Sequence, residues 1–370
     1  MAVPNHQYWM AKALQQARKG LYSTHPNPRV GCVIVKNDQL IAQGYHSVSG
    51  QPHAEINALN NLQGGATGTD VYVTLEPCAH TGKTPPCADA LIKARPQTVI
   101  VAMQDPNPLV SGRGIEKLKH QGITVIEDVM NEQALELNKG FVKRVTQNLP
   151  YLRIKMASTL DGRTALANGL SQWITGPDSR KDVQRLRASS SAVLSTAETV
   201  LADNASLNVR LTADDLNQSV AVRQPIRIII DSQLKLTGKE KLFETIGDIW
   251  IFTTTKDQQK IDQLISNTCR VFVSDTDKDG HVGLKPMLQK LAELEINEVH
   301  TECGAQLAGA LIQQKLVDEI VLYMAPSLLG TNARGLFDLG EISIMSDQIK
   351  LSLIDVTSFG NDIRIIAKPE

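Results

Sequence analysis

One histidine and two cysteines in the first part of the chain have the types and the order of metal ligands. His53 stands two residues before Glu55, and eight residues separate Cys78 from Cys87. One imidazole and two thiolates make three protein ligands for a tetrahedral zinc ion, which leaves the fourth position open to water. Zinc lowers the pKa of a bound water to about 7, so this set predicts a site that activates water at neutral pH.

Glu55 supplies the second half of that chemistry. It lies two residues from His53, close enough to carry a proton without binding the metal itself. The order His-x-Glu, then Pro-Cys, then Cys is typical of zinc-dependent base deaminases. Two other interpretations stay open: the cysteines could be buried thiols, or His80 could complete a four-ligand structural zinc site.

Length and charge exclude several other classes of function. With 370 residues, the chain is long enough for two or three domains. Its 38 basic and 39 acidic residues nearly cancel, which argues against a broad nucleic-acid-binding surface. The sequence has no apolar run of about 18 residues, so no membrane partner is expected.

Two further features point to a cytoplasmic protein. The first 20 residues lack the apolar core of a secretory signal, and their apolar spacing predicts an amphipathic helix. The five cysteines are an odd and low number, which suits a reducing compartment better than a disulfide framework.

Strand-like and helical segments alternate along the first part of the chain. Strands are predicted at residues 30–35, 39–46, 71–75, 98–102 and 123–126, with the segment before Pro77 extended as far as Glu76. Helices are predicted at residues 54–62, 87–94, 115–120 and 132–146. This alternation indicates an α/β domain whose later strands are mostly parallel.

A break at residues 148–150 separates a second α/β region, because a proline ends the preceding helix. We therefore predict one domain over residues 1–147 and another over 148–370. Strands of the second are expected at residues 151–157, 192–194, 226–231, 249–253, 271–273, 298–301, 317–324 and 363–367. Helices fall between them, notably at residues 287–294 and 307–315.

Longer motifs carry a specific resemblance. They read PCAHTGKTPPC at residues 77–87, HPNPRVG at 25–31, GYH at 44–46 and DPNPLVSGRG at 105–114. With them, almost the whole chain resembles the bifunctional deaminase–reductase family of riboflavin biosynthesis. The resemblance implies an N-terminal cytidine-deaminase-like three-layer α/β domain followed by a C-terminal dihydrofolate-reductase-like α/β domain. It also implies Zn²⁺ and NADPH as cofactors and assembly into a homo-oligomer.

For the first domain, the resemblance implies hydrolytic deamination of 2,5-diamino-6-(5-phosphoribosylamino)pyrimidin-4(3H)-one to 5-amino-6-(5-phosphoribosylamino)uracil. His53, Cys78 and Cys87 would hold zinc, and Glu55 would carry protons. Contacts with this small-molecule substrate would come from Asn27, His46, His80, Lys83, Asp105 and Asn107. The ordinary alternatives are turn chemistry for the asparagines that precede prolines and a solvated cation for the lysine.

For the second domain, the motifs RIKMASTLDGR (153–163), SQWITG (171–176) and ECGAQLAGALI (302–312) resemble the reductase half of the same family. The resemblance implies NADPH-dependent reduction of the ribosyl group, giving 5-amino-6-(5-phosphoribitylamino)uracil. No Gly-x-Gly-x-x-Gly follows a strand, so a Rossmann cofactor site is not expected. The turn at Gly304 before a helix could admit a phosphate, or it could be an ordinary tight turn. Arg187 and Arg210 could clamp a phosphate or form surface ion pairs.

The resemblance also assigns individual roles in the reductase. Polar catalytic candidates are Lys155, Asp203 and Glu302. Cofactor contacts are expected from Ala157, Trp173, Thr199, Asp203, Ser232, Gly304, Ala305, Gln306, Leu307, Ala308, Gly309 and Ala310. Substrate contacts are expected from Ser171, Arg187, Leu207, Arg210 and Glu302.

One alternative function is a zinc-dependent nucleotide or tRNA base deaminase with an unrelated C-terminal domain. Such an enzyme should show Cys-x-x-Cys and a basic strip, and the chain has neither. A non-enzymatic zinc-stabilised module would leave Glu55 without a role.

Overall fold

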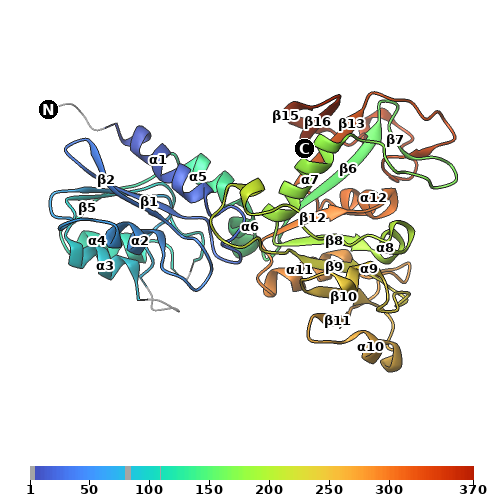
Figure 1. Cartoon of the computed structure of the whole chain (residues 1–370), viewed down its shortest axis with the longest axis horizontal. Coiled ribbons are helices and arrows are strands. Elements are labelled where there is room, and N and C mark those ends of the chain that lie inside the picture. The colour runs from blue at the N-terminus through green and yellow to red at the C-terminus, as the bar shows by residue number, and fades with distance from the viewer. Residues whose placement is uncertain (1–4, 80–84, 109) are drawn as a thin grey trace. The chain divides into compact units, whose positions relative to one another are not determined.

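The computed structural model describes residues 5–79, 85–108 and 110–370. It divides into unit 1, Met1–Asn148 with Asn217–Ala221, and unit 2, Leu149–Leu216 with Val222–Glu370 (Figure 1). The domain limits at residues 147 and 148 stay a prediction. No helix in the described part of the chain combines the length and the apolar character needed to cross a membrane.

Unit 1 is built on a five-stranded sheet in the order β2-β1-β3-β4-β5. The strands are β1 (Gly31–Lys36), β2 (Gln39–Tyr45), β3 (Asp70–Val73), β4 (Thr98–Val101) and β5 (Thr124–Ile126). The first pairings are antiparallel and the β3–β4 and β4–β5 pairings are parallel, which confirms the predicted character of the later strands. The helices are α1 (His6–Arg18), α2 (Ala54–Asn60), α3 (Cys87–Ala94), α4 (Arg113–His120), α5 (Asn131–Leu137) and α6 (Lys139–Gln147).

Helices cover both faces of this sheet, with α1 and α5 on one side and α2, α3 and α4 on the other (Figure 1). The predicted N-terminal amphipathic helix is α1, and its apolar residues Trp9, Met10, Ala13 and Leu14 are buried. Asn5 caps this helix by accepting a hydrogen bond from the backbone N–H of Tyr8. The result is the three-layer arrangement that the strand and helix pattern predicts.

A nine-stranded sheet forms the centre of unit 2, in the order β11-β10-β9-β8-β12-β6-β13-β16-β15. Pairings from β11 to β13 are parallel, and β16 and β15 add antiparallel strands. The strands are β6 (Tyr151–Thr159), β8 (Ala192–Thr196), β9 (Ile226–Ile230), β10 (Ile249–Thr253), β11 (Cys269–Val273), β12 (Glu298–Glu302), β13 (Glu319–Ala325), β15 (Leu351–Phe359) and β16 (Asp362–Pro369). A separate two-stranded sheet joins β7 (Arg163–Ala165) and β14 (Arg334–Gly335).

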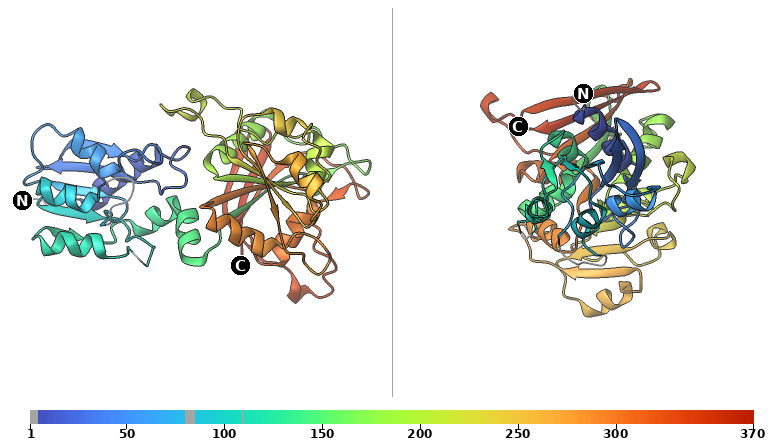
Figure 2. Two further views of the ribbon diagram at one scale, coloured as in Figure 1. Left: turned by 90° about the horizontal axis from the view of Figure 1, so that it is seen from below. Right: turned by 90° about the vertical axis from the view of Figure 1, so that its left-hand side faces the viewer.

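Alternate side chains of the large sheet pack on opposite faces. On β10, Trp250 and Phe252 belong to one core, whereas Ile249 and Ile251 belong to another. The first core also contains α11 (Leu284–Glu293) and α12 (Ala305–Gln313), and the second contains residues of α8 (Ala197–Asp203), α9 (Lys241–Glu244) and α10 (Gln258–Leu264). Helices therefore cover both faces of the twisted sheet (Figure 2, left). The remaining helical segments are α7 (Pro177–Ser189) and two 3-10 turns at Asp214–Leu216 and Met345–Asp347.

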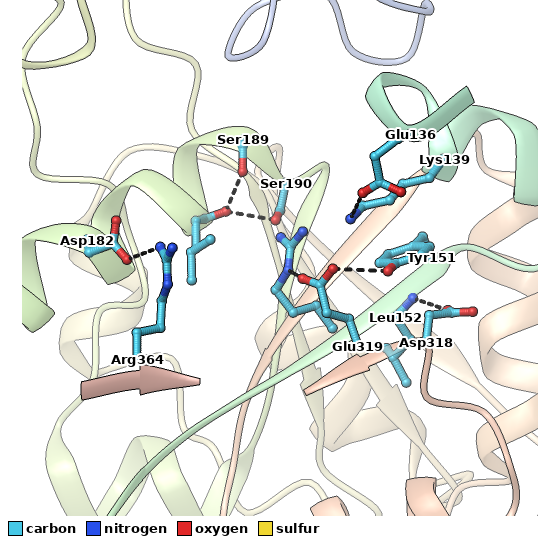
Figure 3. A network of polar contacts seen from close by, with 12 residues as sticks. Glu136, Lys139, Tyr151, Leu152, Asp182, Ser189, Ser190, Asp318, Glu319 and Arg364 are labelled. Carbon is cyan, nitrogen blue, oxygen red and sulfur yellow. Dashed lines mark hydrogen bonds and ion pairs between the residues drawn. The ribbon is translucent and has the colours of Figure 1, made fainter. Parts of the chain in front are cut away.

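Buried polar contacts fix the strand ends of unit 2 (Figure 3). The Tyr151 hydroxyl donates to Glu319 at 3.1 Å, and Arg153 forms an ion pair with the same carboxylate. The backbone N–H of Leu152 donates to Asp318 at 2.7 Å. These contacts join the start of β6 to the start of β13 and so support the register of these two neighbouring strands.

The predicted secondary structure differs from the structure in several details, and the short strands β7 and β14 were not predicted. The single helix predicted at residues 132–146 is two helices, α5 and α6, which divide at Asn138. Its side-chain amide accepts from the backbone N–H of Arg29 at 2.7 Å and donates to the Arg29 carbonyl at 3.0 Å, so a distant segment competes with the helix. The strand predicted to reach Glu76 ends at Val73. Strand β15 was not predicted; a register shift between Leu353 and Asp355 interrupts the alternation.

Gly31 supports a close approach of α1 to β1. A Cβ atom at Gly31 would overlap the Ala13 carbonyl oxygen and lie 2.5 Å from the Ala17 nitrogen, both in the backbone of α1. Gly65 offers a matched control, because a Cβ there meets no atom within 4 Å.

We expect Gly31→Ala to destabilise unit 1 by about 1–3 kcal/mol or more, because backbone atoms cannot move aside without shifting the helix. Gly65→Ala should change stability by no more than about 0.5 kcal/mol. Differential scanning calorimetry of the full chain measures both variants. Equal unfolding temperatures for Gly31→Ala and the parent protein would contradict the packing described for α1.

Candidate metal centre and reductase site

The three predicted metal ligands meet in unit 1. His53 caps the N-terminus of α2, Cys78 lies in the loop after β3, and Cys87 is the first residue of α3. Their ligand atoms all lie within 4.8 Å of one another, and His53 Nδ1 is 3.3 Å from Cys87 Sγ and 3.7 Å from Cys78 Sγ. One nitrogen and two sulfur donors are a set that suits zinc better than the oxygen-preferring cations.

Local electrostatics favour one thiolate in this cluster. The contact with the Cys87 thiol, helped by His53, lowers the pKa of Cys78 to about 4. The backbone N–H of Cys87, at the start of a helix, also donates to Cys78 Sγ at 3.3 Å. Contact with Cys78 and burial raise the pKa of Cys87. The arrangement therefore concentrates negative charge where a cation would bind.

Glu55 lies in the first turn of α2, two residues after His53, and only 3% of it is exposed. Burial raises the pKa of this carboxyl group to about 7. The side chain is therefore a protonatable group in a dry environment beside the cluster, as the motif predicts.

Two predicted substrate residues, Asn27 and His46, contact each other. His46 is buried, and burial lowers its pKa, so the ring is neutral at physiological pH. Its Nδ1 lies 3.2 Å from the Pro52 carbonyl, which assigns the proton to that nitrogen, and its Nε2 accepts from Asn27 Nδ2 at 3.0 Å. The rings of His46 and His53 meet edge to face, with their centroids 5.4 Å apart. These residues are thereby brought beside the metal cluster.

The remaining substrate candidates of unit 1 fall into two groups. His80 and Lys83 lie outside the described residues. Asp105 and Asn107 follow β4, and the Asp105 carboxylate accepts from the backbone N–H of Asn107 at 2.9 Å. Glu76, two residues before the ligand Cys78, connects Asp105 to the metal cluster. Its carboxylate accepts from the backbone N–H of Asp105 at 3.1 Å.

Several reductase candidates lie at one edge of the large sheet in unit 2. Lys155 of β6 pairs with Glu302 of β12, and β8 and β9 run parallel to them. The carboxyl ends of parallel strands share one edge, which is where ligands bind in open α/β sheets. Ala157, Thr199, Ser232 and Gly304 lie at or just beyond these strand ends.

Glu302 and Arg187 form a bidentate ion pair at this edge. Arg187, from α7, donates through Nε to Oε1 and through Nη2 to Oε2 at 2.9 Å. Burial opposes ionisation of Glu302, but Arg187 and His300 outweigh it and lower the pKa of Glu302 well below its usual range. Burial also lowers the pKa of the neighbouring Lys155 amine. The Arg187–Glu302 ion pair is therefore charged, and its two hydrogen bonds fix both side chains in place.

The same helix holds the other substrate candidates of unit 2. Arg187 Nη1 donates to the Asn208 carbonyl at 2.9 Å, and the Gln184 amide oxygen accepts from the backbone N–H of Arg210 at 2.9 Å. Leu207, directly before Asn208, is buried and has a positive φ of 55°. The segment around residues 207–210 is thereby fixed against α7.

Other candidates occupy more open positions. The Trp173 side chain is 70% exposed, with the Arg180 guanidinium 4.6 Å from its ring centroid. Ser171 lies in the same loop, half-buried. Asp203 ends α8, and among the described polar contacts none joins it to Lys155, Glu302 or Arg187. The structure therefore brings Lys155 and Glu302 together on adjacent strands, and the catalytic role of Asp203 stays a prediction.

Residues 304–310 form the turn and first part of α12. Gly304 caps this helix in an extended conformation, and a Cβ there would meet no atom within 4 Å, so space is open above the turn. Gly309 is needed for another reason, since a Cβ there would overlap the Asp338 carbonyl. Ala305, Gln306, Leu307, Ala308 and Ala310 follow Gly304 along the helix.

Sequence reasoning missed two polar residues beside these sites, Glu76 and His300. Both are buried, and His300 Nε2 lies 3.5 Å from Glu302 Oε1. Two features of the sequence could have indicated them. Glu76 directly precedes Pro77 and Cys78, and His300 lies inside the strand predicted at residues 298–301.

Family comparisons match each unit separately. Residues 3–103 match the family described as the cytidine and deoxycytidylate deaminase zinc-binding region, and residues 150–365 match the RibD C-terminal domain. Together they confirm the predicted order of a deaminase-like domain followed by a dihydrofolate-reductase-like domain. The second match excludes an unrelated C-terminal domain.

Full-length relatives agree with these matches. Riboflavin biosynthesis protein RibD of Escherichia coli (strain K12) is 44% identical over 362 residues, which cover 96% of this chain and 97% of the relative. The structure of Acinetobacter baumannii RibD, form 1, superposes with a TM-score of 0.90 at 43% identity and covers 99% of both chains. A Thermotoga maritima structure, described as a diaminohydroxyphosphoribosylaminopyrimidine deaminase/5-amino-6-(5-phosphoribosylamino)uracil reductase, gives a TM-score of 0.87 at 33% identity, with 99% of both chains covered. The chain therefore belongs to the RibD family of riboflavin biosynthesis proteins.

Proposed function

We propose that this protein catalyses two consecutive steps of riboflavin biosynthesis. Unit 1 deaminates 2,5-diamino-6-(5-phosphoribosylamino)pyrimidin-4(3H)-one, and unit 2 reduces the resulting 5-amino-6-(5-phosphoribosylamino)uracil to the ribityl compound. The observation that carries the proposal is the meeting of His53, Cys78 and Cys87 beside the buried carboxyl group of Glu55. The name of the Thermotoga maritima relative supports both substrates.

His53, Cys78 and Cys87 would hold Zn²⁺ for the deamination, since one imidazole and two thiolates suit three of its four ligand positions. When bound, zinc supplies activated water for attack on the carbon that carries the amino group. Glu55 takes the proton that the attacking water loses and gives it to the adjacent ring nitrogen. It later carries the proton of the newly added hydroxyl to the departing ammonia. Asn27 and His46 orient the pyrimidine as hydrogen-bonding groups, with His46 neutral.

Reduction in unit 2 uses NADPH, which supplies a hydride when bound. Arg187 and Glu302 hold the substrate at the carboxyl edge of the sheet. The ribosyl carbon takes the hydride and its bond to the ring oxygen breaks, and Lys155 beside Glu302 is placed to give a proton to that oxygen. Ala157, Trp173, Thr199, Ser232 and residues 304–310 contact the cofactor in this proposal. We assign Asp203 to cofactor contact rather than proton transfer, since no polar contact in the described part of the chain joins it to Lys155 or Glu302.

Apolar side chains on the edge strand β15 support assembly into a homo-oligomer. Leu353, Ile354 and Val356 are more than half exposed, and β15 pairs with a single neighbour, β16, in the described sheet. An edge strand with exposed apolar residues suits association with another chain.

A reducing cytoplasmic compartment suits the two cysteine ligands.

Glu55→Gln should retain zinc and lose ammonia release by a factor of about 10²–10⁴, because the amide cannot carry a proton. Zinc content by elemental analysis and ammonia release from the diaminopyrimidine measure this. Cys78→Ser is the matched contrast and should lose both zinc and deamination. Deamination by Glu55→Gln at the parent rate would show that another residue carries the proton.

Arg187→Lys should lower kcat/KM of the reduction by about tenfold to a hundredfold, because lysine loses the bidentate contact with Glu302. NADPH oxidation with the deaminated substrate measures it. Arg185→Lys, on the same helix, is the control and should stay within about twofold of the parent. An unchanged kcat/KM for Arg187→Lys would remove Arg187 from the proposed substrate site.

Leu353→Lys should weaken the oligomer, since a charge buried in an apolar interface is costly. Size-exclusion chromatography with light scattering measures the mass of the full-length protein. Ile246→Lys is the control, because Ile246 is 86% exposed and lies away from β15 in the sequence. A parent protein that is monomeric at all concentrations contradicts the proposed assembly.

A further inference from the structure

Glu76 is a buried carboxylate whose hydrogen-bond partners are backbone N–H groups, although glutamates are mostly exposed in proteins. Only 4% of it is exposed, and its carboxylate accepts four backbone N–H groups. Oε2 accepts from Asp105 at 3.1 Å and Gly112 at 2.9 Å, and Oε1 accepts from Gly114 at 2.8 Å and Ile115 at 3.4 Å. Bonds from N–H groups to an ionised oxygen are stronger than those to a neutral one.

These bonds gather two segments onto one side chain. The bonds to Asp105 and Gly112 join both ends of the stretch 105–112, described at residues 105–108 and 110–112, to a single oxygen. The bonds to Gly114 and Ile115 satisfy the first turn of α4, which otherwise has free N–H groups. The stretch 105–112 includes Asp105 and Asn107, the proposed contacts for the substrate.

A second contact ties the same helix to the metal-ligand loop. A Cβ atom at Gly114 would overlap the carbonyl oxygen of Pro77, the residue directly before Cys78. Glu76 itself is bonded to the chain beyond β4 through its backbone N–H, which donates to the Met103 carbonyl at 2.9 Å. The segment 76–78, the start of α4 and the stretch 105–112 therefore meet around one carboxylate.

We propose that Glu76 is a positioning residue of the deaminase. Its carboxylate holds residues 105–108 and 110–112, which include the proposed substrate contacts, in a fixed place relative to Cys78, and hence relative to the metal centre. This inference rests on the proposed function of unit 1. Glu76 touches neither the metal ligand atoms nor the reacting atoms in this account, and it acts through the backbone of residues 105–115.

The isosteric change Glu76→Gln isolates this role. An amide keeps the shape of the side chain, but its NH₂ group faces N–H donors and cannot accept from them. We expect KM for the diaminopyrimidine to rise about tenfold or more while kcat changes by less than about threefold, because binding contacts are displaced and the proton carrier is not. A general loss of folded protein would instead lower kcat and leave KM unchanged.

Amide hydrogen exchange gives a readout that does not depend on activity. In the zinc-loaded full chain, Glu76→Gln should accelerate exchange in peptides covering residues 105–115 and leave unit 2 unchanged. Glu127→Gln is the matched control, because Glu127 contacts Lys119 near the other end of α4 at the protein surface. The control should alter neither KM nor exchange at residues 105–115.

Gly114→Ala provides a second test if unit 1 of Glu76→Gln does not fold, as judged by loss of its bound zinc. The added methyl group pushes the start of α4 away from the Pro77 carbonyl, while the Glu76 carboxylate remains. This variant should also raise KM for the diaminopyrimidine. Unchanged KM and unchanged exchange at residues 105–115 in Glu76→Gln overturn the proposal, even when the parent deaminates normally. A zinc-loaded parent that reduces but never deaminates overturns the proposed function of unit 1, and the positioning role with it.

Discussion

Three ligand atoms from three separate segments must meet at one point for unit 1 to bind a metal. His53 and Cys87 begin helices, and Cys78 lies in a loop, so none of them is fixed by a strand. Their convergence depends on how rigidly the sheet and its helices hold these ends. The close approach of α1 to β1 at Gly31, and of α4 to the loop at Pro77, shows how tightly the supporting elements pack.

Unit 2 positions its groups by a different constraint, the register of parallel strands. Because Lys155 and Glu302 lie opposite each other on adjacent strands, the sheet alone fixes their spacing. Helix α7 then adds Arg187 from outside the sheet. The C-terminal hairpin holds the start of α7. Its Asp362 carboxylate accepts from the backbone N–H of Gly176 and from the side-chain hydroxyl of Ser179. The last strand of the chain thus supports a residue of the proposed substrate site.

Local sequence patterns predicted much of this organisation, and distant contacts account for what they missed. The metal ligands were predictable because their order and spacing carry the chemistry. Most strands were predictable because buried strands of parallel sheets are continuous apolar runs. The break at Asn138 was not, since it depends on Arg29 more than a hundred residues away. Glu76 was missed for the same reason, because its partners lie in residues 105–115.

X-ray absorption spectroscopy at the zinc edge of the zinc-loaded full-length protein tests whether His53, Cys78 and Cys87 bind one metal ion. We expect one zinc per chain, with two sulfur atoms at about 2.3 Å and nitrogen or oxygen atoms at about 2.0–2.1 Å completing four ligands. One of those lighter atoms should be an imidazole nitrogen from His53, and the signal of that ring should disappear in His53→Ala. A shell of three or four sulfur atoms, or a folded protein that binds no zinc, would contradict this expectation.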